Sequence, residues 1–339
     1  MTNHTPLIVV PDGDEEANAV ISRVLEASGS RFDIELHANV PGSVDEWLHR
    51  TRAADAIILS WRLPTEVLRS AEQLRVISFC GTGVSDHVDL AVADERGIKV
   101  LPVRGYGDNA VAEHALGLLF SVLMRVPSAD EAVRLGRWRD DPEWESNWPP
   151  RWELKGKRVG VVGLGGIGRR FAELAAACGM EVVAWSRGVE AVEPRTGIRL
   201  LGLRELFATS DAVSLHLALN DDTKRIIDDT LLRSMKPSAV LINTARGGLV
   251  DTVALAAALD ERRILGAGID VFDSEPAEAA NPLLGSAHAV LTPHTGYNTQ
   301  EASAELMRLA VKNVVDFFDG APDLSEFPSR SGACGSRSR

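Results

Sequence analysis

The stretch RVGVVGLGGIGRRFAELAAACG, residues 158–179, joins a short apolar run, a glycine-rich turn and a helical pattern. The apolar run is typical of a buried strand, and the apolar residues after the turn recur at helical spacing. A strand that runs through GxGxxG into a helix is typical of a dinucleotide-binding unit, whereas the glycines alone would be weak evidence. This stretch therefore predicts a parallel α/β fold with a phosphate-binding turn.

The glycines of this turn have separate physical roles. Gly163 allows the tight turn, Gly165 lets a pyrophosphate approach the main chain, and Gly168 lets helix and strand pack closely. Free N–H groups at the helix start, around Gly166 and Ile167, bind phosphate oxygens. We predict that these five residues bind a dinucleotide; a glycine-rich turn without a ligand is the alternative.

The next apolar run, MEVVAW, is followed by Ser186 and Arg187. An acidic residue at this position would accept hydrogen bonds from the ribose hydroxyls of NAD. Ser186 cannot repel a 2′-phosphate and Arg187 can pair with one, so the sequence predicts NADP(H) in preference to NAD(H). The alternative is that Arg187 stacks on the adenine or faces solvent.

Short β-branched runs alternate with helical segments along the chain. This alternation is typical of parallel sheets with helices on both faces, and 339 residues exceed what one core usually supports. We therefore predict an α/β fold with two Rossmann-like, doubly wound parallel-sheet domains. The expected strands lie in PLIVVPD, RFDIELHA, ADAIILSW, LRVISFCGTG and GIKVLPV, and then in KRVGVVG, MEVVAW, AVSLHLAL, AVLINTARGG, ILGAGIDVF and AVLTPH.

The composition argues against several classes of partner. A formal net charge of −12 and a pI of about 5.2 disfavour nucleic acid and membrane surfaces. The three cysteines, Cys80, Cys178 and Cys334, are too few and too scattered for a disulfide framework or a zinc site, so we predict no metal. We see no signal peptide and no apolar run of about 18 residues, which predicts a cytoplasmic protein.

Residues 109–126, NAVAEHALGLLFSVLMRV, form a helical pattern that is apolar nearly all round. Such a helix must be buried on every side, either within its own domain or against another subunit. We therefore predict a homodimer formed through this region. The following segment, 136–154, contains four of the seven tryptophans and is expected to be ordered, since flexible linkers rarely contain tryptophan.

Three side chains that can act on a carbonyl group follow separate apolar runs. Arg246 follows AVLINTA, Glu275 lies in GAGIDVFDSEP, and His294 follows AVLTP. In a doubly wound sheet, ligands bind beyond the carboxyl ends of the strands, where these residues would meet. A guanidinium binds a carboxylate or polarised carbonyl at two points, and a carboxylate beside an imidazole favours the protonated, proton-donating ring. The three are candidate catalytic residues.

The motifs VGLGGIG, NTARGGLVD, GAGIDVFDSEP and TPHTG together resemble the D-isomer-specific 2-hydroxyacid dehydrogenase family, over nearly all of residues 6–320. The resemblance implies that Arg246 binds the substrate carboxylate and keto oxygen, that His294 exchanges a proton with that oxygen, and that Glu275 pairs with His294. Further residues are implied to contact the substrate (Thr82, Gly83, Val84) or the cofactor (His216, Thr223, Thr244, Ala245, Asp270, Gly296). For His114 and His216 a structural role, in a core helix and at a strand end respectively, is the stronger interpretation.

The same resemblance implies a flavodoxin-like substrate-binding domain of residues 1–103 and 298–320, an NAD(P)-binding domain of residues 104–297, and an interdomain cleft. Residues 321–339 are expected to be disordered, because they are polar and rich in Ser, Gly and Arg. Some positions depart from the family pattern. Gly166 stands where an arginine is frequent, Ala218 where proline is usual, and Tyr297 where a small residue is usual; the loop GTGVSDHVDL is one residue longer.

The expected activity is interconversion of a short 2-keto acid, such as glyoxylate or hydroxypyruvate, with a D-2-hydroxy acid. Hydride would come from the nicotinamide and the proton from His294. One alternative is formate oxidation, because SDHVDL resembles formate dehydrogenases, although TPHTGYN lacks the serine–glycine pattern after their histidine. The other is a dinucleotide-sensing binding protein of the same fold, against which the presence of Arg246, Glu275 and His294 argues.

Overall fold

The computed structural model describes residues 5–27, 29, 31–144, 148, 151–186, 192–193 and 195–321. The chain divides into two compact units, one of residues up to Tyr106 together with those from Gln300 onward, and one of Gly107–Thr299. The sequence placed these boundaries three and two residues earlier. All of the tail predicted to be disordered, except Ala321, lies outside the described residues.

The first unit contains a five-stranded parallel sheet in the order β2-β1-β3-β4-β5. The order reverses between β1 and β3, which makes the unit doubly wound with a switch point at these two strands. Its elements are β1 (Leu7–Val10), α1 (Glu15–Ala27), β2 (Asp33–Leu36), α2 (Val44–Thr51), β3 (Ala56–Leu59), α3 (Thr65–Ser70), β4 (Val76–Phe79), η1 (Val84–Asp86), α4 (Leu90–Glu95), β5 (Lys99–Pro102) and α13 (Gln300–Phe318).

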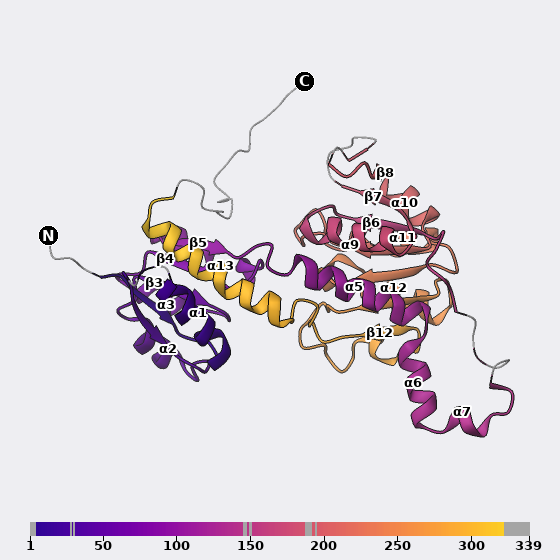
Figure 1. The fold of residues 1–339 in the computed structure, drawn as a ribbon, viewed down its shortest axis with the longest axis horizontal. Coiled ribbons are helices and arrows are strands. Elements are labelled where there is room, and N and C mark those ends of the chain that lie inside the picture. The colour runs from indigo at the N-terminus through magenta and orange to yellow at the C-terminus, as the bar shows by residue number, and fades with distance from the viewer. Residues whose placement is uncertain are drawn as a thin grey trace. The chain divides into compact units, whose positions relative to one another are not determined.

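Helices cover both faces of this sheet. Successive strand residues point to opposite faces, so Ile8 and Val10 pack with α1 and α13, while Val9 packs with α2, α3 and α4. Helix α13, yellow in Figure 1, lies beside α1 although more than 270 positions separate them in the sequence. Both faces being buried explains why the central strands are apolar throughout rather than alternating.

The second unit contains a seven-stranded parallel sheet in the order β12-β11-β10-β9-β6-β7-β8. The glycine-rich turn follows β6, an interior strand that lies between β9 and β7. The elements are α5 (Asp108–Leu123), α6 (Val126–Arg134), α7 (Arg137–Asp140), β6 (Arg158–Val162), α9 (Gly166–Ala177), β7 (Glu181–Trp185), β8 (Arg199–Leu200), α10 (Leu203–Thr209), β9 (Ala212–Leu215), α11 (Asp229–Ser234), β10 (Val240–Asn243), η2 (Gly247–Leu249), α12 (Thr252–Asp260), β11 (Gly266–Ile269), η3 (Pro282–Gly285) and β12 (Ala289–Leu291).

Helix α5 buries one face within its own unit, whereas Asn109, Glu113 and Gly117 are exposed, so the helix is not buried on every side as expected. It packs against α9 and against β10, β11 and β12. The contact with β11 is close because a Cβ on Gly266 would lie 2.7 Å from Val122, and one on Gly268 would lie 2.9 Å from Leu118. The apolar pattern of residues 109–126 is therefore explained by the core of this unit, which was one of the two alternatives.

The structure differs from the sequence-based expectation at the end of this helix. Helix α5 ends at Leu123, Arg125 adopts a left-handed conformation with φ 53°, and α6 starts at Val126. Helices α6 and α7 then extend away from the sheet of their unit (Figure 1). The short strand β8 was not expected from the sequence, because its two residues, Arg199 and Leu200, provide no period-2 pattern.

No single helix in the described part of the chain has the length and apolarity to cross a membrane; the pair α5 and α6 meets those two criteria jointly but is bent by 59°.

A buried carboxylate marks the switch point of the first unit. Asp12 follows β1 and is 1% exposed. It accepts hydrogen bonds from the backbone N–H groups of Ser60 (3.1 Å) and Trp61 (2.6 Å), which follow β3. Burial raises the pKa of Asp12 to about 6, although these N–H groups and the charge of Arg50 act in the opposite direction.

This pKa predicts a pH-dependent stability. Because the folded state holds the Asp12 proton more tightly than the unfolded chain, the contribution of this group is fully present below about pH 4 and is lost as the pH rises through about 6. As the pH rises from 4 to 7.5, the free energy of unfolding of the wild type should therefore fall relative to that of Asp12→Asn, by up to about 3 kcal/mol.

Urea unfolding at several pH values measures this difference, with the exposed Asp33→Asn as the control. A constant difference between Asp12→Asn and wild type across this range would contradict the prediction.

Candidate active site

His294 lies in a loop that a buried carboxylate holds in place. Asp270, directly after β11, is 1% exposed. It accepts hydrogen bonds from the hydroxyl of Thr292 (2.5 Å) and from the N–H groups of Thr295 (3.0 Å) and Gly296 (2.9 Å). Its carbonyl accepts the N–H of His294 at 2.8 Å. The loop therefore has little freedom, and His294 adopts a left-handed conformation with φ 54°.

The loop leaves little space for a side chain beside the carboxylate. A Cβ on Gly296 would lie 3.0 Å from Asp270 Oδ2 and 3.2 Å from the ring of His114. His114 Nε2 lies 3.0 Å from the hydroxyl of Thr292 and 3.3 Å from Asp270 Oδ1. Burial acts to raise the pKa of Asp270, but the hydrogen bonds from His114, Thr292 and the loop N–H groups outweigh it and lower the pKa.

His294 and Glu275 are in direct contact. His294 Nδ1 lies 2.6 Å from Glu275 Oε2, with about one third of each side chain exposed. The other oxygen of Glu275 accepts the N–H of Phe272 at 3.0 Å. Burial acts to raise the pKa of Glu275, but the hydrogen bonds from His294 and Phe272 and the charges of His294 and Arg246 lower it. Glu275 is thus held as a carboxylate beside the imidazole.

Arg246 lies on a turn fixed by a buried amide. Asn243, the last residue of β10, is 1% exposed; its amide donates to the carbonyl of Arg246 (2.9 Å) and accepts the N–H of Ala245 (3.1 Å). A Cβ on Gly247 would lie 2.0 Å from the backbone of Phe272. This close packing brings the turn after β10 against the turn after β11. The guanidinium donates to the carbonyl of Ala245 at 2.7 Å.

The glycine-rich turn has the geometry that the sequence predicts. Gly163 adopts φ 101°, and a Cβ there would lie 2.5 Å from the carbonyl of His216. A Cβ on Gly168 would lie 1.9 Å from the carbonyl of Gly163. Gly165 has no heavy atom among the described residues within 4 Å of the Cβ position. The first and third glycines allow close packing, whereas the second faces open space.

The other residues predicted to contact the cofactor lie in different surroundings. Ser186 follows β7, and Arg187 lies outside the described residues. His216 is half-buried against α9: its ring lies 5.1 Å from that of Phe171 and bonds the hydroxyl of Ser214 (2.9 Å), and burial lowers its pKa to about 3. Its carbonyl and Cβ lie against the glycine-rich turn, 2.5 Å from a Cβ on Gly163 and 3.4 Å from a Cβ on Gly168 respectively.

Thr223 and Thr244 are both buried but differ in their partners. The hydroxyl of Thr223 donates to the carbonyl of Ala218 at 2.8 Å, which closes the loop after β9. The hydroxyl of Thr244, directly after β10, has no hydrogen-bond partner among the described residues. An orphaned buried hydroxyl at the carboxyl end of a central strand is available to a ligand.

The predicted substrate loop belongs to the first unit. Thr82 and Gly83 follow β4, and Val84 is buried and opens η1. A Cβ on Gly81 would lie 3.0 Å from the ring of Phe79, so the chain must turn sharply here.

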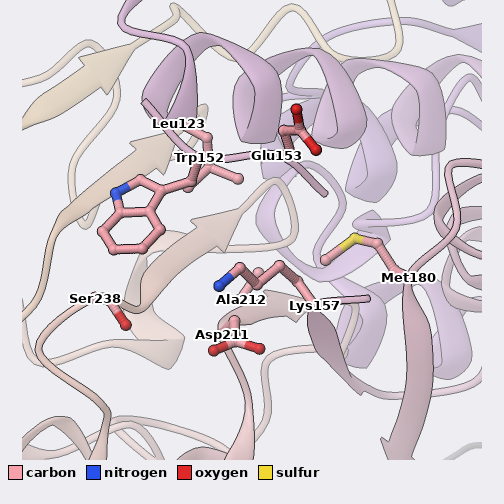
Figure 2. A pocket seen from close by; sticks show the side chains of 8 residues that line it. All are labelled: Leu123, Trp152, Glu153, Lys157, Met180, Asp211, Ala212 and Ser238. Carbon is pink, nitrogen blue, oxygen red and sulfur yellow. The ribbon is translucent and has the colours of Figure 1, made fainter. Parts of the chain in front are cut away.

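Two contributors to the site were not predicted as such: Thr292 and Asn243, which fix the loops that carry His294 and Arg246. Figure 2 shows a further pocket, lined by Leu123, Trp152, Glu153, Lys157, Met180, Asp211, Ala212 and Ser238. Lys157 and Asp211 precede β6 and β9, so this pocket lies at the amino ends of the strands, opposite to His294, and contains none of the predicted site residues. In the part of the chain that is described, no cluster of three or more His, Cys, Asp or Glu side chains is arranged to hold a metal ion.

Comparison with known proteins identifies the second unit. Residues 116–296 match the family model of the D-isomer specific 2-hydroxyacid dehydrogenase, NAD binding domain. A glyoxylate reductase of Aeropyrum pernix is 34% identical over 311 residues, covering 89% of this chain and 91% of the relative.

Solved structures agree with this match. An acyclic imino acid reductase in complex with NADPH and D-Arg has a TM-score of 0.80 and 30% identity, covering 94% of this chain and 99% of that one. An NADPH-dependent glyoxylate/hydroxypyruvate reductase of Sinorhizobium meliloti, in complex with NADP and malonate, has a TM-score of 0.78 and 28% identity, covering 96% and 97%. These relatives are enzymes, so the sensing alternative is not favoured. The chain belongs to the D-isomer specific 2-hydroxyacid dehydrogenase family and is an NAD(P)-dependent oxidoreductase.

Proposed function

We propose that this enzyme reduces a short 2-keto acid with NADPH, with His294 as the proton donor, Glu275 as its partner and Arg246 as the substrate-binding cation. The contact that carries the proposal is the 2.6 Å distance between His294 Nδ1 and Glu275 Oε2. A carboxylate on one ring nitrogen orients the imidazole and favours its protonated form. The other nitrogen, Nε2, has no partner within the described part of the chain and is free to serve a substrate.

The chemistry of the side chains follows from these positions. A bound dinucleotide supplies the hydride that the carbonyl carbon receives. His294 gives the Nε2 proton to the carbonyl oxygen during reduction and takes it back during oxidation. Glu275 holds the ring in position for the transfer through Nδ1. Arg246, whose charge already acts on Glu275, opposes the negative charge that develops on the oxygen and binds the substrate carboxylate.

The glycine-rich turn is suited to the dinucleotide. The open space at Gly165 allows a pyrophosphate to reach the main chain, and the N–H groups at the start of α9 face the same turn. The unpartnered hydroxyl of Thr244 is a ready hydrogen-bonding group for the same ligand. Asp270 is also proposed to contact the nicotinamide end, in addition to holding the loop of His294. The contacts predicted for Thr223, Ala245 and Gly296 stay predictions.

The substrate class rests on the relatives. Proteins named glyoxylate reductase and hydroxypyruvate reductase match most of this chain, so we propose glyoxylate, hydroxypyruvate or a related short 2-keto acid. Tyr297 supports a short substrate, since its ring lies edge-on to that of His294 with centroids 6.0 Å apart. The substrate contacts of Thr82, Gly83 and Val84, the interdomain cleft and the cytoplasmic location stay predictions.

Loss of the proton donor should separate chemistry from binding. In His294→Ala we expect kcat to fall by about 10²- to 10⁴-fold, with the Kd for NADPH unchanged, because the ring acts on the keto acid. Glu275→Gln should lower kcat by at least about tenfold, whereas Glu278→Gln, an exposed neighbour, should not change it. Steady-state rates with glyoxylate measure kcat, and titrations with NADPH measure its Kd. Undiminished turnover by His294→Ala would contradict the proposal.

The cofactor preference is testable at the end of β7. Ser186→Asp should repel the 2′-phosphate and accept hydrogen bonds from the ribose hydroxyls, so the ratio of kcat/KM for NADPH to that for NADH should fall by at least about tenfold. The control Ser186→Asn introduces a side chain of nearly the same size as aspartate but without its charge, and should keep the wild-type ratio. A wild-type enzyme that strongly prefers NADH would contradict the NADPH part of the proposal.

We propose a homodimer, through a surface that differs from the one first expected. Helix α5 packs its apolar face against its own unit, and the large apolar residues exposed after it belong to α6, α7 and the residues between and after them: Val126, Val133, Leu135, Trp138 and Trp144, each between 41% and 64% exposed. Trp138 and Trp144 pack edge-on with centroids 6.1 Å apart. Exposed apolar side chains gathered on one short segment are suited to contact with a second copy of the chain.

Acidic side chains placed on this surface should prevent dimerisation. Sedimentation should show a dimer of the 36.5 kDa wild-type chain and a monomer for the double variant Leu135→Glu, Trp138→Glu. Val253, which is 72% exposed on α12, provides the control, and Val253→Glu should stay dimeric. A monomeric wild type, or a dimer that persists in the double variant, would refute this surface.

A further inference from the structure

A carboxylate lies directly against the glycine-rich turn. Asp108 is the first residue of α5, Gly166 is the first residue of α9, and the two helices pack against each other. A Cβ on Gly166 would lie 1.8 Å from Asp108 Oδ2, 2.5 Å from its Cγ and 2.9 Å from Oδ1. The Asp108 carboxylate therefore occupies the space that a side chain at position 166 would fill.

The two arginines that follow the turn do not neutralise this carboxylate. Arg170 donates to the amide oxygen of Asn109 (2.7 Å) and pairs with Glu173 (3.1 Å). Arg169 pairs with Glu193 at 3.2 Å. The side chain of Asp108 has no hydrogen-bond or ion-pair partner among the described residues. Its half-buried position raises the pKa of the carboxyl, as expected for an acid that is desolvated without a nearby cation.

The position matters because of what the turn would bind. The start of a twelve-residue helix carries free N–H groups and a partial positive charge, which favour anions. Gly165 is the N-cap residue of α9, and no side chain in the described part of the chain accepts a capping hydrogen bond there. The N–H groups at the helix start are therefore left for a ligand. A pyrophosphate on the same turn would share this small region with the Asp108 carboxylate, and like charges at close range repel.

We propose that Asp108 is an affinity-lowering residue of the cofactor site, whose carboxylate weakens the binding of every dinucleotide through repulsion of the pyrophosphate. The inference rests on the proposed function, in which the turn Gly163–Gly168 holds the pyrophosphate. It differs from the role of Ser186 and Arg187, because the pyrophosphate is common to NADPH and NADH. Asp108 therefore sets how tightly the enzyme holds a dinucleotide, not which one it selects.

The test compares dissociation constants in the intact chain. Asp108→Asn removes the charge and keeps the shape, and Asp108→Ser is a second, smaller variant. Titrations followed by tryptophan fluorescence should show that both variants bind NADPH, NADH and ADP-ribose about tenfold more tightly than wild type. The Kd for adenosine, which has no pyrophosphate, should not change. Glu173→Gln, which removes an acidic charge further along α9, should bind all four ligands as wild type does.

Ionic strength distinguishes repulsion from a change in shape. The gain in affinity should shrink as salt is raised from about 0.02 to about 0.5 M, because exposed charges are screened. Unchanged or weaker dinucleotide binding by both variants, where the wild type binds NADPH and NADH, would overturn the role of Asp108 and leave the proposed function intact. A wild-type chain that binds neither dinucleotide would overturn the proposed function and this inference with it.

Discussion

The active site depends on one buried carboxylate. Asp270 has almost no contact with solvent, yet the hydrogen bonds it receives lower its pKa and keep it charged. A buried charge is costly unless its hydrogen-bonding capacity is filled, and here the donors that fill it come mainly from the loop that follows β12. Because the buried charge needs these donors, the loop must keep the conformation that supplies them. This constraint fixes the backbone of His294 in a conformation that the residue would not adopt alone.

A second constraint is the close packing of backbone at the carboxyl edge of the sheet. Gly163 contacts the carbonyl of His216, Gly168 that of Gly163, and Gly247 the backbone of Phe272, each at a distance that leaves no room for a Cβ. These contacts bring successive strand-ending turns together. As a result, Arg246 and Glu275, which come from different turns, are near enough for the charge of one to act on the other. Close backbone contacts of these glycines, rather than contacts of the charged residues alone, therefore bring Arg246 and Glu275 together.

Much of this arrangement was predictable from the sequence. The glycine-rich turn has a local signature that only one backbone conformation satisfies, and the fully buried parallel strands are apolar runs that composition alone reveals. The strand ends placed Glu275 and His294 at one edge of the sheet, and the family resemblance implied that the two residues pair. The family comparisons agree with the fold and the reaction class.

Other features could not be predicted, for physical reasons. The break at Arg125 lies two residues before Pro127, which favours the start of a new helix. The sequence therefore marks a boundary here, but the apolar pattern of residues 109–126 does not fix the residue at which α5 ends. The apolar face of α5 has the same pattern whether it is covered by its own sheet or by another subunit, so only coordinates separate the two. The contact between Asp108 and Gly166 arises from the packing of two helices whose first residues are 58 positions apart. Sequence spacing carries no information on such a contact.

The central claim is that Glu275 holds the ring of His294 through Nδ1 and leaves Nε2 for the substrate. Nuclear magnetic resonance of the enzyme with ¹⁵N-labelled histidine tests it most directly. The account predicts a strongly deshielded Nδ1–H proton assigned to His294, which disappears in Glu275→Gln while the other histidine signals stay in place. A His294 ring that carries its proton on Nε2 alone, with no deshielded Nδ1–H and no response to Glu275→Gln, would contradict it.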